Sequence, residues 1–111
     1  MAQRATTAKE IFEAMPGRFL PEQAGDLNAV IQFDLSGEGG GQWTLSVADR
    51  KATVTDGTTP NPNMTFSTDA ADFVAIINGD LNPMNAFMQG KVKVKGDMTL
   101  ALKLQNIFKR D

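Results

Sequence analysis

The chain contains no cysteine, no histidine and no tyrosine among its 111 residues. Without cysteine it can form no disulfide, thiolate nucleophile or cysteine-based metal site. Without histidine it lacks the side chain most often used for proton transfer near neutral pH, and also the commonest metal ligand. A catalytic triad that needs histidine is therefore excluded. This composition argues against an enzyme, and we expect neither a cofactor nor a metal site.

Long hydrophobic runs are also absent, because no stretch of 18 apolar residues occurs that could span a bilayer. Residues 1–6 lack the apolar stretch of a secretory signal, and we therefore expect a cytoplasmic protein. The net charge of −2 combines −6 over residues 1–90 (5 basic, 11 acidic) with +4 over residues 91–111 (6 basic, 2 acidic). This basic end is too small to indicate a nucleic-acid partner. The length fits a single domain, residues 1–111.

The first helix is predicted from residue 7. Thr7 and Glu10 have the spacing of a capping box, and apolar residues follow at helical spacing as far as Met15. Another short helical turn is expected near Pro21. Further helices are predicted after a cap at Thr68 or Asp69, after a cap at Asn82, and from residue 97 onward.

Between these helices the sequence has the period of two that is typical of strands. Each strand has one apolar and one polar face, which predicts an α+β fold whose sheet has one covered face and one solvated face. A glycine-rich hairpin is expected at residues 37–41 and a loop at residues 57–63. The five expected strands are residues 29–35, 43–48, 51–55, 64–67 and 92–94.

The final helix is apolar around more of its circumference than a surface helix needs. At about 100° per residue its apolar side chains cover an arc of about 220°, whereas docking on a core needs a stripe only about 100° wide or a little more. The surplus is expected to face a second protein layer, a partner or an apolar ligand. Its apolar residues are Met98, Leu100, Ala101, Leu102, Leu104, Ile107 and Phe108.

The segment from residue 82 to residue 105 has the most specific pattern, NPMNAFMQGKVKVKGD followed by LALKLQ. It resembles the sterol carrier protein 2 (SCP-2) family, and the first strand, the glycine-rich hairpin and Trp43 are similar to the N-terminal half of that family. The resemblance covers roughly residues 8–108. It implies a five-stranded mixed sheet of order 3-2-1-4-5, covered on one face by about four to five helices.

The resemblance also implies a hydrophobic tunnel between sheet and helices that holds a fatty acid, fatty acyl-CoA, phospholipid or sterol. The chain ends in Lys109-Arg110-Asp111 instead of the targeting tripeptide of peroxisomal members, which favours a free-standing prokaryotic version. The residues that match the tunnel region are Phe33, Leu35, Trp43, Phe73, Ile77, Phe87, Met88, Met98, Leu102 and Gln105.

Several of these residues have an alternative interpretation. The methionines and phenylalanines are more often core than ligand contacts, and Gln105 is as consistent with a backbone partner as with a ligand head group. Lys91, Lys93 and Lys95 either make a transient contact with an anionic membrane surface or, as we favour, protect an edge strand from pairing.

The sequence therefore predicts an intracellular lipid-binding or lipid-transfer protein, monomeric or weakly dimeric. A non-enzymatic interaction or dimerisation module, which would use the apolar final helix, is the alternative. An enzyme that relies on Asp, Glu or Lys alone is a third possibility, for which no convergent motif is present.

Overall fold

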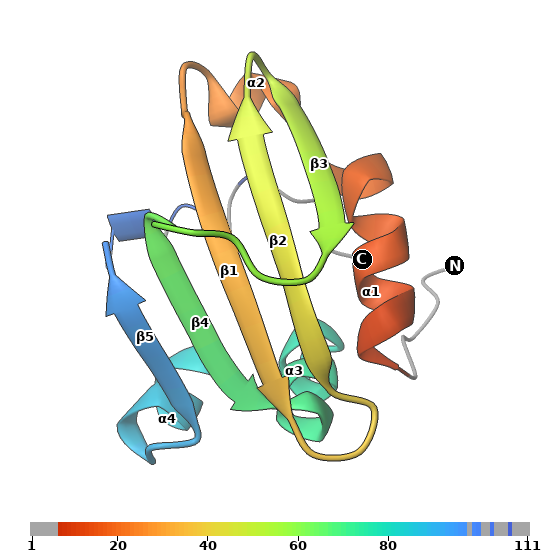
Figure 1. The fold of residues 1–111 in the computed structure, drawn as a ribbon. Helices are drawn as coiled ribbons and strands as arrows, with labels where there is room; N and C mark the ends of the chain where they lie inside the picture. Colours follow the sequence, from red (N-terminus) through yellow and green to blue (C-terminus); the bar gives the residue numbers. More distant parts are fainter. Residues whose placement is uncertain (1–6, 98, 101–102, 104–106, 108–111) are drawn as a thin grey trace.

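The computed structural model describes residues 7–97, 99, 100, 103 and 107. Figure 1 shows a twisted sheet with helices behind it. The helical elements are α1 (Ala8–Ala14), a 3-10 turn (Met15–Arg18), α2 (Pro21–Ala24), α3 (Ala70–Ile77) and α4 (Pro83–Met88). The strands are β1 (Ala29–Ser36), β2 (Gly41–Ala48), β3 (Lys51–Asp56), β4 (Met64–Asp69) and β5 (Val92–Gly96).

The five strands form one mixed sheet of order β3-β2-β1-β4-β5. β1 is parallel to β4, and the other three neighbouring pairs are antiparallel. The register places Phe33 of β1 between Trp43 of β2 and Phe66 of β4, so three aromatic side chains lie side by side on one face. The predicted fold class and strand order are confirmed.

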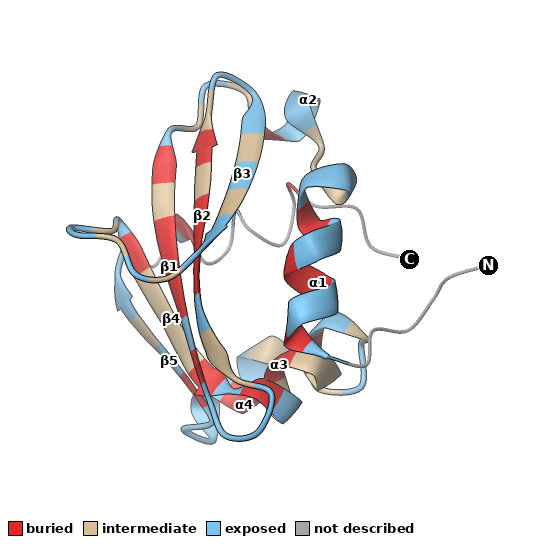
Figure 2. Ribbon diagram, turned by 45° about the vertical axis from the view of Figure 1, so that its right-hand side comes forward, coloured by how far each residue is buried: buried red, intermediate tan, exposed pale blue. Residues whose placement is uncertain are grey.

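Helices cover one face of this sheet (Figure 2). Ala8, Ile11 and Phe12 of α1 are buried, as are Ala70, Phe73 and Ile76 of α3. These residues follow one another at the three- and four-residue spacing that brings side chains to one side of a helix. The opposite sides of both helices carry more exposed residues, as Figure 2 shows by colour. The apolar sides of α1 and α3 therefore form the second layer of the core.

Local capping explains where three helices begin. The Thr7 side chain accepts a hydrogen bond from the Glu10 backbone N–H (3.2 Å), and Asp69 accepts one from Ala71 (2.8 Å). Asn82 caps α4, with Pro83 in the first turn. The predicted caps at Thr7 and Asn82 are confirmed, and Asp69 rather than Thr68 caps α3.

The final helix is described at four positions only. The Asp97 side chain accepts a hydrogen bond from the Thr99 N–H (2.9 Å), and residues 99, 100, 103 and 107 are helical. Leu100 and Ile107 are buried against the core. Most of the predicted apolar arc, and with it the predicted dimerisation surface, lies outside the described residues. Among the described residues no helix is long and apolar enough to cross a membrane.

The outer face of the sheet differs from the prediction. Gln32 and Thr44 were expected in solvent, but both are buried. The loop from β3 to β4 crosses the sheet over β2 and β1 (Figure 1) and covers them. The Gln32 side chain accepts a hydrogen bond from the Thr59 N–H (2.8 Å), while Thr44 donates one to the Gly57 carbonyl (3.0 Å). β3 and β4 are separated by two strands, so the connection has to cross them.

Candidate functional site

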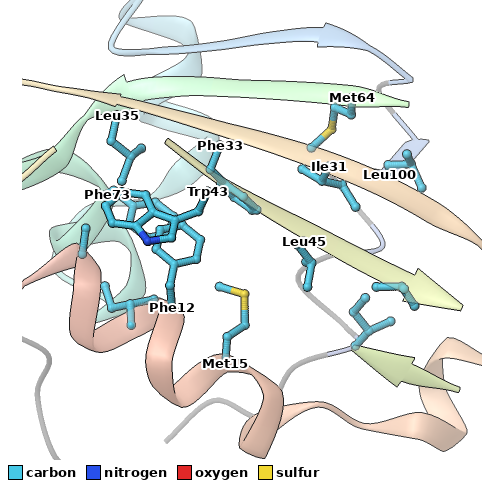
Figure 3. Packing of buried hydrophobic residues seen from close by; sticks show 14 of the residues in the cluster. Phe12, Met15, Ile31, Phe33, Leu35, Trp43, Leu45, Met64, Phe73 and Leu100 are labelled. Carbon is cyan, nitrogen blue, oxygen red and sulfur yellow. The ribbon is translucent and has the colours of Figure 1, made fainter. Parts of the chain in front are cut away.

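Four of the predicted site residues come together in the core. Phe33, Leu35, Trp43 and Phe73 are all buried, and Figure 3 shows them converging from the sheet and α3. The residue at their centre is Phe12 of α1. Its ring stacks on Trp43 (centroids 4.5 Å apart) and on Phe73 (5.3 Å), and it meets the edge of Phe33 at 5.0 Å. We call Phe12, Phe33, Trp43 and Phe73 the aromatic cluster.

Backbone features of the β1–β2 hairpin shape this end of the core. Gly41 lies against the Trp43 ring, and a Cβ at this position would be 3.1 Å from the ring. A side chain at Gly41 would therefore crowd the indole that stacks on Phe12. Rings at stacking and edge-to-face distances fill this part of the layer with side chains. The aromatic cluster is thus a packed element of the core.

Three other predicted site residues lie on the surface. Ile77 is 44% exposed, Phe87 41% and Met88 78%. α4 instead turns Ala86 toward the sheet, where Ala86 is fully buried with Ile76 and Val92. A small residue at this point lets the helix backbone approach β5 closely. Met98, Leu102 and Gln105 lie outside the described residues.

A cavity lies at the other end of the covered face, beside α2. Its volume is about 960 Å³, and it is open toward the surface. The backbone N–H of Leu20 donates a hydrogen bond to the Ile107 carbonyl (2.7 Å), which joins the segment before α2 to the final helix. The described lining residues are Leu20, Gln23, Ala24, Asp26, Leu27, Asn28, Lys103 and Ile107.

The described lining of this cavity is half aliphatic and half polar, the polar residues being Gln23, Asp26, Asn28 and Lys103. Leu20, Ala24, Leu27 and Ile107 supply aliphatic surface, and Lys103 supplies a positive charge. Pockets for small molecules are typically about 300–1,000 Å³ in volume and mostly apolar, with a small number of polar groups that orient the ligand. The volume of this cavity lies within that range, but its lining is more polar, so an apolar molecule would pack only on the four aliphatic side chains.

Metal chemistry has no support in the described part of the chain. No group of three or more His, Cys, Asp or Glu side chains there is arranged to hold a metal ion. Within the same residues every buried side-chain nitrogen and oxygen has a hydrogen-bond partner.

Comparison with known proteins identifies the family. The model of the SCP-2 sterol transfer family matches residues 9–109. The chain belongs to this family. Membership supports a role in binding or transferring lipid. Hydroxysteroid dehydrogenase-like protein 2 of Xenopus tropicalis is 36% identical over 108 residues, which are 96% of this chain and 26% of that protein. This chain thus spans about a quarter of the length of such relatives.

Solved structures agree with the fold. The solution structure of palmitated SCP2L2 from Aedes aegypti matches 95% of this SCP-2 chain and 97% of its own, with a TM-score of 0.73 and 26% identity. The sec-alkylsulfatase Pisa1 from Pseudomonas sp. contains a similar region, with a TM-score of 0.84. At 18% identity, and with 17% of that protein covered, this second likeness shows the fold alone.

The sequence prediction did not include the residues around α2. Their only signal was the short helical turn expected near Pro21, which is confirmed as α2. Phe12 was also missing from the predicted site, although its spacing from Ala8, Ile11 and Met15 placed it on the core side of α1. Hydrophobic spacing thus identified the buried side of the helix without showing which residue lies at the centre of the aromatic cluster.

Proposed function

We propose that this SCP-2 chain holds a fatty acid, fatty acyl-CoA, sterol or similar apolar ligand between its sheet and its helices, without catalysing a reaction. The observation that carries the proposal is the cavity beside α2, in a member of a lipid-binding family. Its volume is suited to an acyl chain, and the absence of histidine and cysteine favours physical binding over catalysis.

The driving force would be burial of the hydrocarbon. Each methylene removed from water contributes about 0.8 kcal/mol, so ten of them contribute about 8 kcal/mol before the costs of ordering ligand and protein. The polar rim, with Gln23, Asn28 and Lys103, would keep the head group near solvent. The palmitated state of the Aedes aegypti structure makes a fatty acid the ligand to test first.

Native mass spectrometry of the purified protein, followed by organic extraction, tests whether it carries a lipid. We expect a co-purified fatty acid, acyl-CoA or phospholipid, or else saturable binding of added palmitate by the lipid-free protein. The proposal would be wrong if the folded, lipid-free protein bound none of palmitate, palmitoyl-CoA and cholesterol.

Two tryptophan variants locate the ligand. Leu27→Trp and Gln23→Trp each add a large ring to the cavity wall, and we expect palmitate affinity to fall at least tenfold, which is about 1.4 kcal/mol. The control is Ile77→Trp, an exposed residue at the α3 end that the sequence assigned to the tunnel. If only the control bound palmitate more weakly, the binding site would be the tunnel region predicted from sequence instead of the cavity beside α2. Thermal unfolding of all three variants verifies that they are folded.

A further inference from the structure

The most exposed large apolar side chains of the described residues gather around α4. Met88 is 78% exposed, Met84 54%, Ile77 44% and Phe87 41%. An ordinary surface helix turns its large apolar side chains toward the core. On α4 the small Ala86 faces the sheet instead, while the methionines and Phe87 face outward. Contiguous exposed apolar groups commonly mark a contact surface.

Positive charge lies at the same edge of the sheet as these side chains. The Lys91 N–H donates a hydrogen bond to the Ala86 carbonyl (2.9 Å), which fixes the start of β5 against α4. Lys91, Lys93 and Lys95 are all exposed. Between residues 77 and 96 they are opposed by one acidic residue, Asp80, although the whole chain has a net charge of −2. Apolar groups and cations are therefore concentrated at one edge of the sheet, on the two sides of β5.

The α4–β5 surface is defined here as Ile77, Met84, Phe87, Met88, Lys91, Lys93 and Lys95. β5 is the last strand of the sheet, and α4 lies at the same edge (Figure 1). The lysines project from the outer side of β5, whereas α4 packs against its inner side through Ala86 and Val92. The long, flexible lysine stems can bring their ammonium groups around the edge to the level of the α4 side chains.

The charge pattern selects one occupant for this surface. A second copy paired along β5 would bring like charges together, because lysine occupies alternate positions of that short strand. An anionic bilayer would instead attract the lysines to its head groups and admit the methionines and Phe87 into its interfacial region. We propose that the α4–β5 surface docks this protein on anionic lipid membranes.

The test is flotation of the lipid-free, full chain with vesicles. One set contains phosphatidylcholine alone and the other contains equal parts of phosphatidylcholine and phosphatidylglycerol. We expect binding to the anionic vesicles that weakens as salt increases, since ions screen exposed charges. This measurement needs no cargo in the cavity, so its failure and the failure of the proposed function are distinguishable.

Two pairs of variants locate the contact. Lys91→Gln with Lys93→Gln should weaken partitioning onto anionic vesicles by about 10- to 30-fold. Lys9→Gln with Lys51→Gln changes the net charge equally at exposed positions on α1 and β3, and should retain most of the binding. Met84→Ser with Met88→Ser should weaken binding several-fold, by removing apolar contacts at positions that the fold leaves exposed.

Three outcomes would overturn the proposal. The first is no partitioning onto anionic vesicles even at low salt. The second is equal loss in both lysine pairs, which would mean that net charge alone governs binding. The third is a dimer in sedimentation velocity that is abolished by Met84→Ser with Met88→Ser, without vesicle binding, which would assign the α4–β5 surface to a second copy.

Discussion

The two ends of the layer between sheet and helices are built differently. Near α3 the aromatic cluster fills the space, with Phe12 stacked between Trp43 and Phe73. Near α2 lies a cavity of about 960 Å³, whose described walls include Ala24 and Leu27 and no residue of the five strands. One end of the molecule is thus closed by packed rings (Figure 3), whereas the other borders open space.

The difference shows how one small domain can combine a stable core with room for a ligand. Large planar side chains at one end contribute most of the buried area per residue. At the other end α2 has only four residues and presents Ala24 as its buried side chain, so it cannot fill the space beneath it. We infer that stability depends mainly on the aromatic end and ligand binding on the α2 end.

Phe12→Ala is the variant for which we expect the largest loss of stability. Removal of a buried ring that contacts three others should cost about 3–5 kcal/mol of unfolding free energy. The matched change at the other end, Leu27→Ala, removes a partly buried side chain and should cost about 1–2 kcal/mol. Urea denaturation of both variants measures the contrast. Equal losses would mean that the two ends contribute equally to stability.

A smaller effect is expected for Gly40→Ala in the β1–β2 hairpin. A Cβ on Gly40 would clash with the Leu35 carbonyl oxygen, so the hairpin that closes the aromatic end would have to shift. We expect a cost of about 1–3 kcal/mol. Gly39→Ala is not a suitable control because its φ is +79°, whereas Gly17→Ala meets no atom within 4 Å and should change stability little. An unchanged melting temperature for Gly40→Ala would show that the hairpin can shift without loss of stability.

Much of the fold could be predicted from local patterns. Alternation of apolar and polar residues located every strand, and the Thr7 and Asn82 caps marked helix starts, because these signals depend on neighbours in the chain. Burial of Gln32 could not be predicted in this way. Gln32 does lie on the polar face of the sheet, as expected. The loop that covers it, however, comes from a segment 25 or more residues away in the sequence.

The candidate site was harder to predict from local sequence patterns than the fold. A cavity results from space that the described side chains around α2 leave unfilled, and a shape of this kind has no periodic signature in sequence. α4 illustrates the same difficulty. Phe87 and Met88 are both exposed and Ala86 faces the sheet, but spacing alone does not show which side of the helix packs inward.

The smallest predicted effect concerns the charge at the open end. If a fatty acid occupies the cavity beside α2, the exposed ammonium group of Lys103 attracts its carboxylate, and Lys103→Gln should weaken palmitate binding about two- to fivefold. Methyl palmitate, which has no charge, should bind both proteins equally. Asp26→Asn, on the same cavity wall, should act in the opposite direction because it removes a repelling carboxylate.

Isothermal titration at low and high salt measures these differences, which should shrink as ions screen the pair. Lys9→Gln, at an exposed position in the first turn of α1, serves as the matched control. Equal losses for palmitate and its methyl ester would show that Lys103 contacts the hydrocarbon chain with its stem. A loss confined to the acid would instead place the carboxylate of the ligand beside Lys103 at the rim of the cavity.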